Sequence, residues 1–240
     1  MATAAPRIQR RGAAVAALAL AAGATLWAIT ASSGGPSTPP TPPPAAPAAP
    51  ERSAPRIPPE RPRPARIRWR RSVAVGAPAG GTLVRGVPLP SAGRHFFTWD
   101  PVRRQSPNRS WRRWGTDRLV RVLLGVARRY HRAHPAAARM AIGDLSRPRG
   151  GDFGPRFGYI GHASHQNGLD ADVYYPRRDG AERAPRGAGQ IDRRLSQELV
   201  DRFLAVGAAL VFVGPSTGLT GPRVGVLANH DNHLHVRLGR

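Results

Sequence analysis

The chain has 240 residues, no cysteine and a formal net charge of +23, and all 37 of its basic residues are arginine. Without cysteine it can have no thiolate nucleophile, no disulfide, no all-cysteine zinc site and no lipid-modified cysteine anchor. The charge predicts attraction to polyanions, which include an anionic cell wall, an anionic membrane surface and nucleic acid.

The first 33 residues have the features of an export signal. Three arginines within the first eleven residues precede an uncharged run, mainly of Ala and Leu, from Ala13 to Ala31. The run is longer than the ~7–15-residue core of a cleaved signal peptide and close to the ~20 residues that span a bilayer. We therefore expect residues 1–33 to be a signal peptide or a signal anchor, with residues 13–31 in the membrane if the signal is retained. Either outcome predicts a periplasmic or other extracytoplasmic location for the rest of the chain.

Residues 34–71 are expected to be an extended linker. Half of the 26 prolines lie between Pro36 and Pro64, and such a density of proline prevents regular helices and sheet ladders. Arginines follow from Arg52 to Arg71. This basic end is typical either of a solvated linker in an arginine-rich protein or of a contact with a wall or membrane surface.

The folded domain is expected to span residues 72–240. It should begin with two short strands, at 72–77 and 82–89, because Gly80-Gly81 interrupts the apolar pattern. The next element is a helix from Thr116 to His134, with Thr116 as its N-cap and an apolar stripe that we assign to the core. His131 and His134 are expected to be solvated at the exposed end of this helix.

The remaining elements follow from periodicity and breakers. A short strand at 140–142 should lead into a loop at 143–154, and a second helix should begin at Asp192 or Ser196 and end at Val206, capped by Gly207. Further strands are expected at 209–213, 224–227 and 233–238.

Two segments alternate with a period of two, which is typical of strands that present different chemistry on their two faces. Between Leu169 and Tyr175, Asp170 and Asp172 share one face. Near the carboxyl end, His233, His235 and Arg237 share one face of the last strand. One sheet could therefore present Asp172 and His235 toward a common point.

A metal site is the chemistry that these residues favour. His165, in the loop before the first of these strands, completes a set of two imidazoles and one carboxylate with Asp172 and His235, and such a set leaves a fourth position of a zinc ion open for water. The spacing alone leaves Asp170 as an alternative carboxylate ligand. The chain contains neither a G-x-S-x-G elbow nor an H-E-x-x-H helix, so a serine hydrolase and a helix-borne zinc protease are disfavoured.

A hydrolase also needs groups that move protons. His233 is the best candidate for the general base, because it shares a strand face with His235. His230 is the second candidate and could bind the oxyanion. His162 and Asp170 suit a role in orienting the imidazoles that bind the metal.

Three strings of the sequence resemble penicillin-insensitive murein endopeptidases, and the resemblance covers roughly residues 82–240. They are Ser-His165-Gln-Asn-Gly-Leu-Asp-Ala-Asp172, Gly143-Asp-Leu-Ser and His230-Asp-Asn-His-Leu-His-Val-Arg237. The H-x(6)-D and H-x-H spacings within them are similar to those of the wider group of lysostaphin-type peptidases, D-Ala-D-Ala carboxypeptidases and the hedgehog amino-terminal domain.

The resemblance implies a zinc endopeptidase that cuts D-Ala–diaminopimelate cross-links in peptidoglycan. By matching positions, it implies that His165, Asp172 and His235 bind Zn²⁺, that His230 and His233 are catalytic, and that His162 lies nearby. The implied fold class is α+β, with a small antiparallel sheet that carries the metal site and is flanked by helices, as in hedgehog and D-Ala-D-Ala peptidases. The long amino-terminal extension departs from the family.

Alternatives of other classes remain open at this point. A D,D- or L,D-carboxypeptidase of the same fold uses similar chemistry, and a non-catalytic cell-wall-binding module could retain the fold. Peptidoglycan is the expected partner. Nucleic acid is not expected, because the export signal and the lack of an Arg/aromatic recognition motif oppose it.

Overall fold

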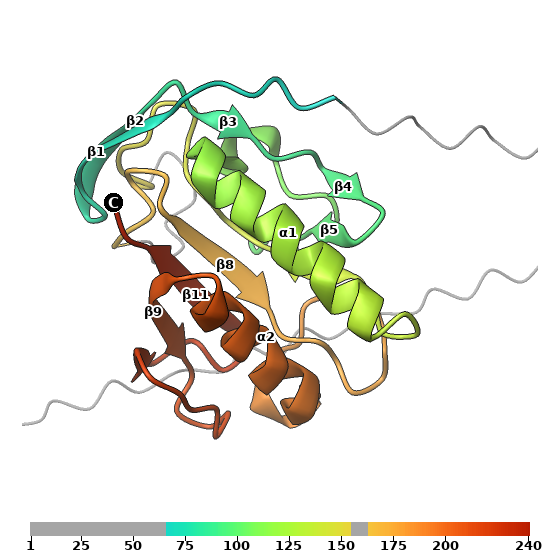
Figure 1. The fold of residues 1–240 in the computed structure, drawn as a ribbon. Coiled ribbons are helices and arrows are strands. Elements are labelled where there is room, and N and C mark those ends of the chain that lie inside the picture. Colours follow the sequence, from blue (N-terminus) through green and yellow to red (C-terminus); the bar gives the residue numbers. More distant parts are fainter. Residues whose placement is uncertain (1–65, 155–162) are drawn as a thin grey trace, which may run out of the picture. The chain divides into compact units, whose positions relative to one another are not determined.

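The computed structural model describes residues 66–154 and 163–240, and its largest element is a seven-stranded sheet (Figure 1). The order of the strands in this sheet is β10-β9-β11-β8-β7-β5-β4. The strands are β4 (Ala92–Gly93), β5 (Phe96–Thr98), β7 (Met140–Ile142), β8 (Asp170–Tyr174), β9 (Ala208–Val213), β10 (Val224–Val226) and β11 (His233–Leu238). The expected signal or anchor at 1–33, most of the expected linker, and His162 lie outside the described residues.

The sheet is mixed: the expectation of an antiparallel sheet holds for the pairs in its centre and for β4–β5 but is wrong for two other pairs. The pairs β9–β11, β11–β8 and β8–β7 are antiparallel, whereas β10–β9 and β5–β7 are parallel. Between β5 and β7 the chain passes through a long helix, and a crossover of this kind is what allows two neighbouring strands to run in the same direction. The fold class is α+β with few helices.

Both helices pack on the same face of the sheet (Figure 1). Helix α1 (Asp117–Ala133) begins at Thr116, whose side chain accepts a hydrogen bond from the Leu119 N–H, and helix α2 (Arg193–Ala205) begins at Asp192, which accepts from Leu195. Such caps satisfy N–H groups that the helix itself leaves without partners. The predicted positions of both helices are confirmed, including Gly207 after α2 with φ +83°.

The two histidines at the end of α1 are not simply solvated, as had been expected. His134 Nε2 lies 2.5 Å from a carboxylate oxygen of Glu198 on α2, and the ring of His131 packs on that of His95 with 4.9 Å between the centroids. The pairing between helices could not be anticipated from the periodicity of one helix. It ties the carboxyl end of α1 to α2.

The alternation predicted for β8 and β11 is confirmed. Ala171 and Val173 of β8, with Leu234 and Val236 of β11, belong to the same buried cluster as the apolar sides of α1 and α2. Because successive residues of a strand point to opposite faces, the residues between them lie on the face away from the helices. That face carries the candidate site.

The remaining strands and short helices hold the loops around the sheet. They are β1 (Val73–Ala77), β2 (Gly80–Val84), β3 (Val87–Pro88), β6 (Trp114–Gly115), η1 (Ser110–Arg112) and η3 (Ala188–Gln190). Strand β1 pairs with β2, and β3 with β6.

Ile67 packs against the core and Arg70 Nε donates to the Gly86 carbonyl, so contacts with the domain begin upstream of residue 72. Within residues 66–154 and 163–240, no helix is long and apolar enough to cross a membrane.

The glycine pair at 80–81 lies inside β2 rather than interrupting the strands as predicted. A Cβ at Gly81 would lie 2.4 Å from the backbone oxygens of Ala77 and Val75, whereas a Cβ at Gly80 would meet nothing within 4 Å. The hairpin also contacts the loop that carries His165, because Gln166 N donates to the Pro78 carbonyl at 3.0 Å. Gly81 therefore allows a close backbone approach beside that loop.

These neighbouring glycines offer a matched pair of variants. Gly81→Ala is expected to lower the free energy of unfolding by about 1–3 kcal/mol, because backbone atoms must move to admit the methyl group. Gly80→Ala should change it by less than about 1 kcal/mol in either direction. Urea denaturation of the metal-free protein measures both, and equal effects of the two substitutions would contradict the close approach at Gly81.

Candidate metal centre

The face of the sheet away from the helices carries a row of paired polar side chains along β8 and β11. In the antiparallel register, Arg237 lies opposite Asp170, His235 opposite Asp172, and His233 opposite Tyr174. Because each strand contributes every second residue, the three pairs share one face. The row places an ion pair at one end, a histidine–carboxylate pair in the middle and a histidine–tyrosine pair at the other end.

His165 reaches this row from a loop with an unusual backbone conformation. Its φ is +69°, in the left-handed region that costs free energy for a residue with a Cβ. Its backbone N–H donates to Asp170 Oδ2 at 3.1 Å, and its Nδ1 lies 2.8 Å from the carbonyl oxygen of Leu145. These two hydrogen bonds hold a strained conformation that directs the opposite ring nitrogen toward the row.

The three residues expected to bind a metal converge on one buried point. Asp172 Oδ1 lies 3.3 Å from His165 Nε2 and 3.3 Å from His235 Nδ1. One ligand atom from each of the three residues lies within 4.8 Å of the others. All three are buried, with exposed fractions of 1%, 5% and 6% for His165, Asp172 and His235.

The protonation chemistry of this cluster fits a bound cation. A carbonyl oxygen can only accept, so His165 Nδ1 carries the hydrogen that it donates to Leu145, and a neutral ring then presents a lone pair at Nε2. That lone pair and the Asp172 oxygen are both electron-rich, and at 3.3 Å they need a proton or a cation between them. His235 also faces two carboxylates, because its Nε2 lies 3.5 Å from Asp170 Oδ1. A neutral imidazole has only one N–H, so it cannot donate a hydrogen bond to both the Asp170 and the Asp172 carboxylates.

The pKa shifts of His235 and Asp172 also indicate that this cluster favours a positive charge. Burial lowers the pKa of the His235 imidazole, but the carboxylates of Asp170 and Asp172 outweigh burial and raise that pKa to about 9. Burial raises the pKa of Asp172, but the imidazoles of His165 and His233 outweigh it and hold that pKa well below its usual range. The two carboxylates thus favour positive charge between them, on an imidazole or on a bound cation.

Asp170 is engaged differently from Asp172, although the sequence spacing did not separate them. Arg237 Nε donates to Asp170 Oδ1 at 2.8 Å and Arg237 Nη2 donates to Oδ2 at 3.1 Å. With the His165 N–H and the His235 ring also beside it, Asp170 holds both histidines in place. Its pKa is lowered because hydrogen bonds from His235 and Arg237 outweigh the effect of burial.

The two expected catalytic histidines lie beside the cluster. His233 Nε2 is 3.7 Å from Asp172 Oδ1, and its Nδ1 is 2.6 Å from Asn232 Oδ1. The ring of His230 lies 4.6 Å from that of His233, centroid to centroid, and 6.0 Å from that of His235. The structure therefore brings His165, Asp170, Asp172, His230, His233 and His235 together.

A buried ion pair behind the centre was not anticipated as such. Arg112 of η1 is fully buried and donates from Nε to Asp144 Oδ1 at 2.7 Å, with a second contact from Nη2 to Oδ2. The Asp144 carbonyl accepts from the Asp172 N–H at 2.9 Å, and the next residue, Leu145, supplies the oxygen that His165 contacts. The ion pair thus fixes a segment that positions two of the three clustered residues.

Comparison with known proteins places most of the described chain in one family. A family model described as penicillin-insensitive murein endopeptidase matches residues 74–202, which include His165 and Asp172. The matched residues end before β10 and β11, so His235 lies downstream of them. A search of curated proteins finds no match.

Proposed function

The chain belongs to the penicillin-insensitive murein endopeptidase family, and we propose that it is a zinc-dependent hydrolase that cleaves D-Ala–diaminopimelate cross-links in peptidoglycan. The observation that carries this proposal is the convergence of two imidazoles and a carboxylate on one buried point of the sheet. Burying two imidazoles against two carboxylates carries a desolvation cost, and such clusters of perturbed titratable groups are concentrated at functional sites.

In this proposal, His165, Asp172 and His235 hold the zinc ion. Bound there, zinc would polarise the carbonyl of the scissile amide and lower the pKa of a coordinated water to roughly 7. Asp170 Oδ1 lies 3.5 Å from the other ring nitrogen of His235, and a carboxylate in this place would orient the ring and make the ligating nitrogen more basic. Arg237 keeps the Asp170 carboxylate in position for this role.

In this proposal His233 moves the protons and His230 stabilises the oxyanion. Donation from His233 Nδ1 to the Asn232 side-chain oxygen leaves Nε2 with a lone pair on the side of the cluster, where it can take a proton from water and deliver it to the leaving amine. His230 Nδ1 lies 2.8 Å from the Ala228 carbonyl, so this ring too is oriented by the backbone. When protonated, its Nε2 donates a hydrogen bond to the oxyanion of the intermediate. We keep His162 as a further residue near the site.

The proposed setting is extracytoplasmic. Residues 1–33 would direct export as a signal peptide or anchor, residues 34–71 would act as a linker, and residues 72–240 would be the peptidase domain with a hedgehog/D-Ala-D-Ala-peptidase-like fold. The net charge of +23 favours docking on an anionic wall.

The test is digestion of purified sacculi by the full-length protein. We expect mass spectrometry to find cross-linked muropeptide dimers converted into monomers, because the endopeptidase cuts between stems. A strong chelator should stop this conversion, and one equivalent of Zn²⁺ should restore it. The control is the same protein treated with chelator already saturated with zinc.

Three other outcomes would contradict the proposal. Cleavage that persists after complete removal of metal would exclude a zinc mechanism. Release of terminal D-alanine with intact dimers would indicate a carboxypeptidase. Binding of zinc and sacculi without any bond cleavage would indicate a cell-wall-binding module.

A further inference from the structure

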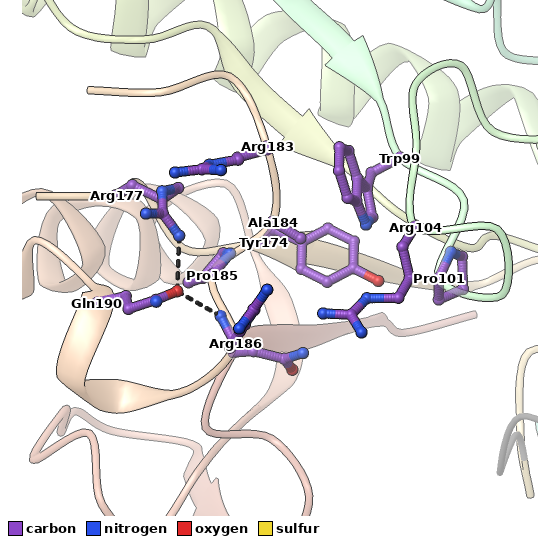
Figure 2. Close-up of a pocket in the computed structure, with 11 residues that line it drawn as sticks. Trp99, Pro101, Arg104, Tyr174, Arg177, Arg183, Ala184, Pro185, Arg186 and Gln190 are labelled. Carbon is purple, nitrogen blue, oxygen red and sulfur yellow. Dashed lines mark hydrogen bonds between the residues drawn. The ribbon is translucent and has the colours of Figure 1, made fainter. Parts of the chain in front are cut away.

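A cavity of about 700 Å³ adjoins the histidine end of the β8–β11 row (Figure 2). Two of its lining residues connect it with the candidate centre. The ring of Tyr174 lies 5.8 Å from that of His233, centroid to centroid, and Asn232 holds His233 Nδ1 through its side chain. A ligand in this cavity therefore lies next to the proposed proton-transfer residue, and the volume is in the usual range of ligand pockets.

The lining of the cavity is strongly basic. Four arginines line it, and they come from two segments that are distant in sequence: Arg104 from the loop after β5, and Arg177, Arg183 and Arg186 from the segment between β8 and α2. Figure 2 shows Arg104 on the same side of the cavity as Trp99 and Tyr174, and Arg177 and Arg183 on the other side. Among the described residues that line it, none is acidic.

The four arginines are not equivalent. Arg177 and Arg183 pair with Asp179, so their charges are partly balanced. Arg104 and Arg186 are exposed, and within residues 66–154 and 163–240 neither forms an ion pair with a carboxylate. Two guanidinium groups without such partners at one cavity leave it with an excess of positive charge that an anionic ligand would balance.

The segment that carries Arg186 is ordered before any ligand arrives. Gln190 Oε1 accepts from Arg177 Nη1 at 2.6 Å and from the backbone N–H of Arg186 at 2.8 Å (Figure 2). Trp99 and Tyr174 provide aromatic surface that suits the aliphatic part of a ligand. A cavity with fixed walls, an apolar surface and an unbalanced positive charge is suited to a flexible, acidic chain.

We propose that this cavity binds the carboxylate groups of the stem peptide beside the scissile bond, with Arg104 and Arg186 as the residues that determine specificity for an acidic substrate. The inference rests on the proposed function, because it assigns the cavity to the substrate of that centre. The two arginines act in binding and take no part in the chemical step. Their removal should therefore raise KM and leave kcat nearly unchanged.

The test compares cross-linked muropeptide dimers with the same dimers in which the diaminopimelate carboxylates are amidated. The full-length Arg104→Gln/Arg186→Gln protein is expected to show a KM about 10–50-fold higher for the acidic dimer, with kcat within about twofold of the original. Amidation should raise the KM of the original protein by a similar factor and should change the KM of the double variant by less than about twofold. The double change Arg128→Gln/Arg132→Gln removes the same charge from two exposed positions on α1, and this control should leave KM unchanged.

A binding measurement separates this inference from the proposed function. Calorimetric titration of the metal-free full-length protein with a single acidic stem peptide requires neither zinc nor hydrolysis. Suppose that the double variant binds the peptide more weakly and that the original protein does not cleave sacculi. This result would support the cavity as a binding site for acidic peptides and would refute the proposed function. Suppose instead that the double variant cleaves sacculi normally, with unchanged KM and unchanged peptide binding. This result would overturn the binding role of the cavity and would leave the proposed function standing.

Discussion

Asp172→Asn is expected to abolish both metal binding and cross-link cleavage while the protein stays folded. The substitution keeps the shape of the side chain but removes the negative charge that lies 3.3 Å from both His165 Nε2 and His235 Nδ1. Losing the metal removes several kcal/mol of transition-state stabilisation, so kcat/KM should fall on the order of 10³-fold or more. Zinc content by elemental analysis and muropeptide release from sacculi measure the two effects.

Two further variants sharpen this test. Asp170→Asn should retain zinc with an affinity lowered on the order of 10–100-fold, because Asp170 acts on the metal through His235. Asp201→Asn, on the exposed side of α2, should change neither zinc content nor cleavage. Full zinc content in Asp172→Asn, or complete loss of zinc in Asp170→Asn alone, would show that the wrong carboxylate has been assigned.

The largest effect on stability is expected for Arg112→Met. The change leaves the Asp144 carboxylate buried without the guanidinium that faces it, and breaking a buried ion pair on one side costs about 3–5 kcal/mol. For a folded domain of this size the midpoint of thermal unfolding should fall by roughly 6–20 °C. Urea and thermal denaturation should be measured in chelator, so that zinc binding does not add to the free energy of unfolding.

The matched control removes both charges together. The double variant Arg112→Met/Asp144→Leu should recover much of the lost free energy of unfolding, because no charge is then left buried alone. It should still bind zinc more weakly than the original protein, since the segment that contacts His165 and Asp172 has lost its fixed support. A double variant as unstable as Arg112→Met would mean that packing around Arg112, rather than charge, accounts for the loss.

Regular elements with a strong period could be predicted from the sequence. The N-cap at Thr116, the glycine at Gly207 and the apolar stripes located α1 and α2, because helix ends and helix faces are local properties. The start of α2 was left open between Asp192 and Ser196, and the structure places it after Asp192. The alternation in β8 and β11, which is also a local property, placed Asp172 and His235 on one face. Much of the candidate site could thus be inferred before any tertiary contact was known.

The features that were missed depend on contacts between distant segments. The two parallel pairs of the sheet follow from where the chain crosses over, which strand patterns do not encode. The left-handed backbone of His165 depends on hydrogen bonds to Asp170 and Leu145 that exist only in the folded protein. Spacing alone left both Asp170 and Asp172 as candidate ligands, because the pairing of Asp170 with Arg237 is a contact between distant segments.

The pairing of β8 with β11 has a consequence for how this protein can change over evolutionary time. Along both strands, odd and even positions serve different demands: one set fills the interior beneath the helices, and the other assembles the histidines and carboxylates. Inserting or deleting a single residue would exchange the two sets, so that charged groups enter the interior and the site is dispersed. Such length changes should be eliminated together with the fold, whereas point substitutions can alter either set without disturbing the other.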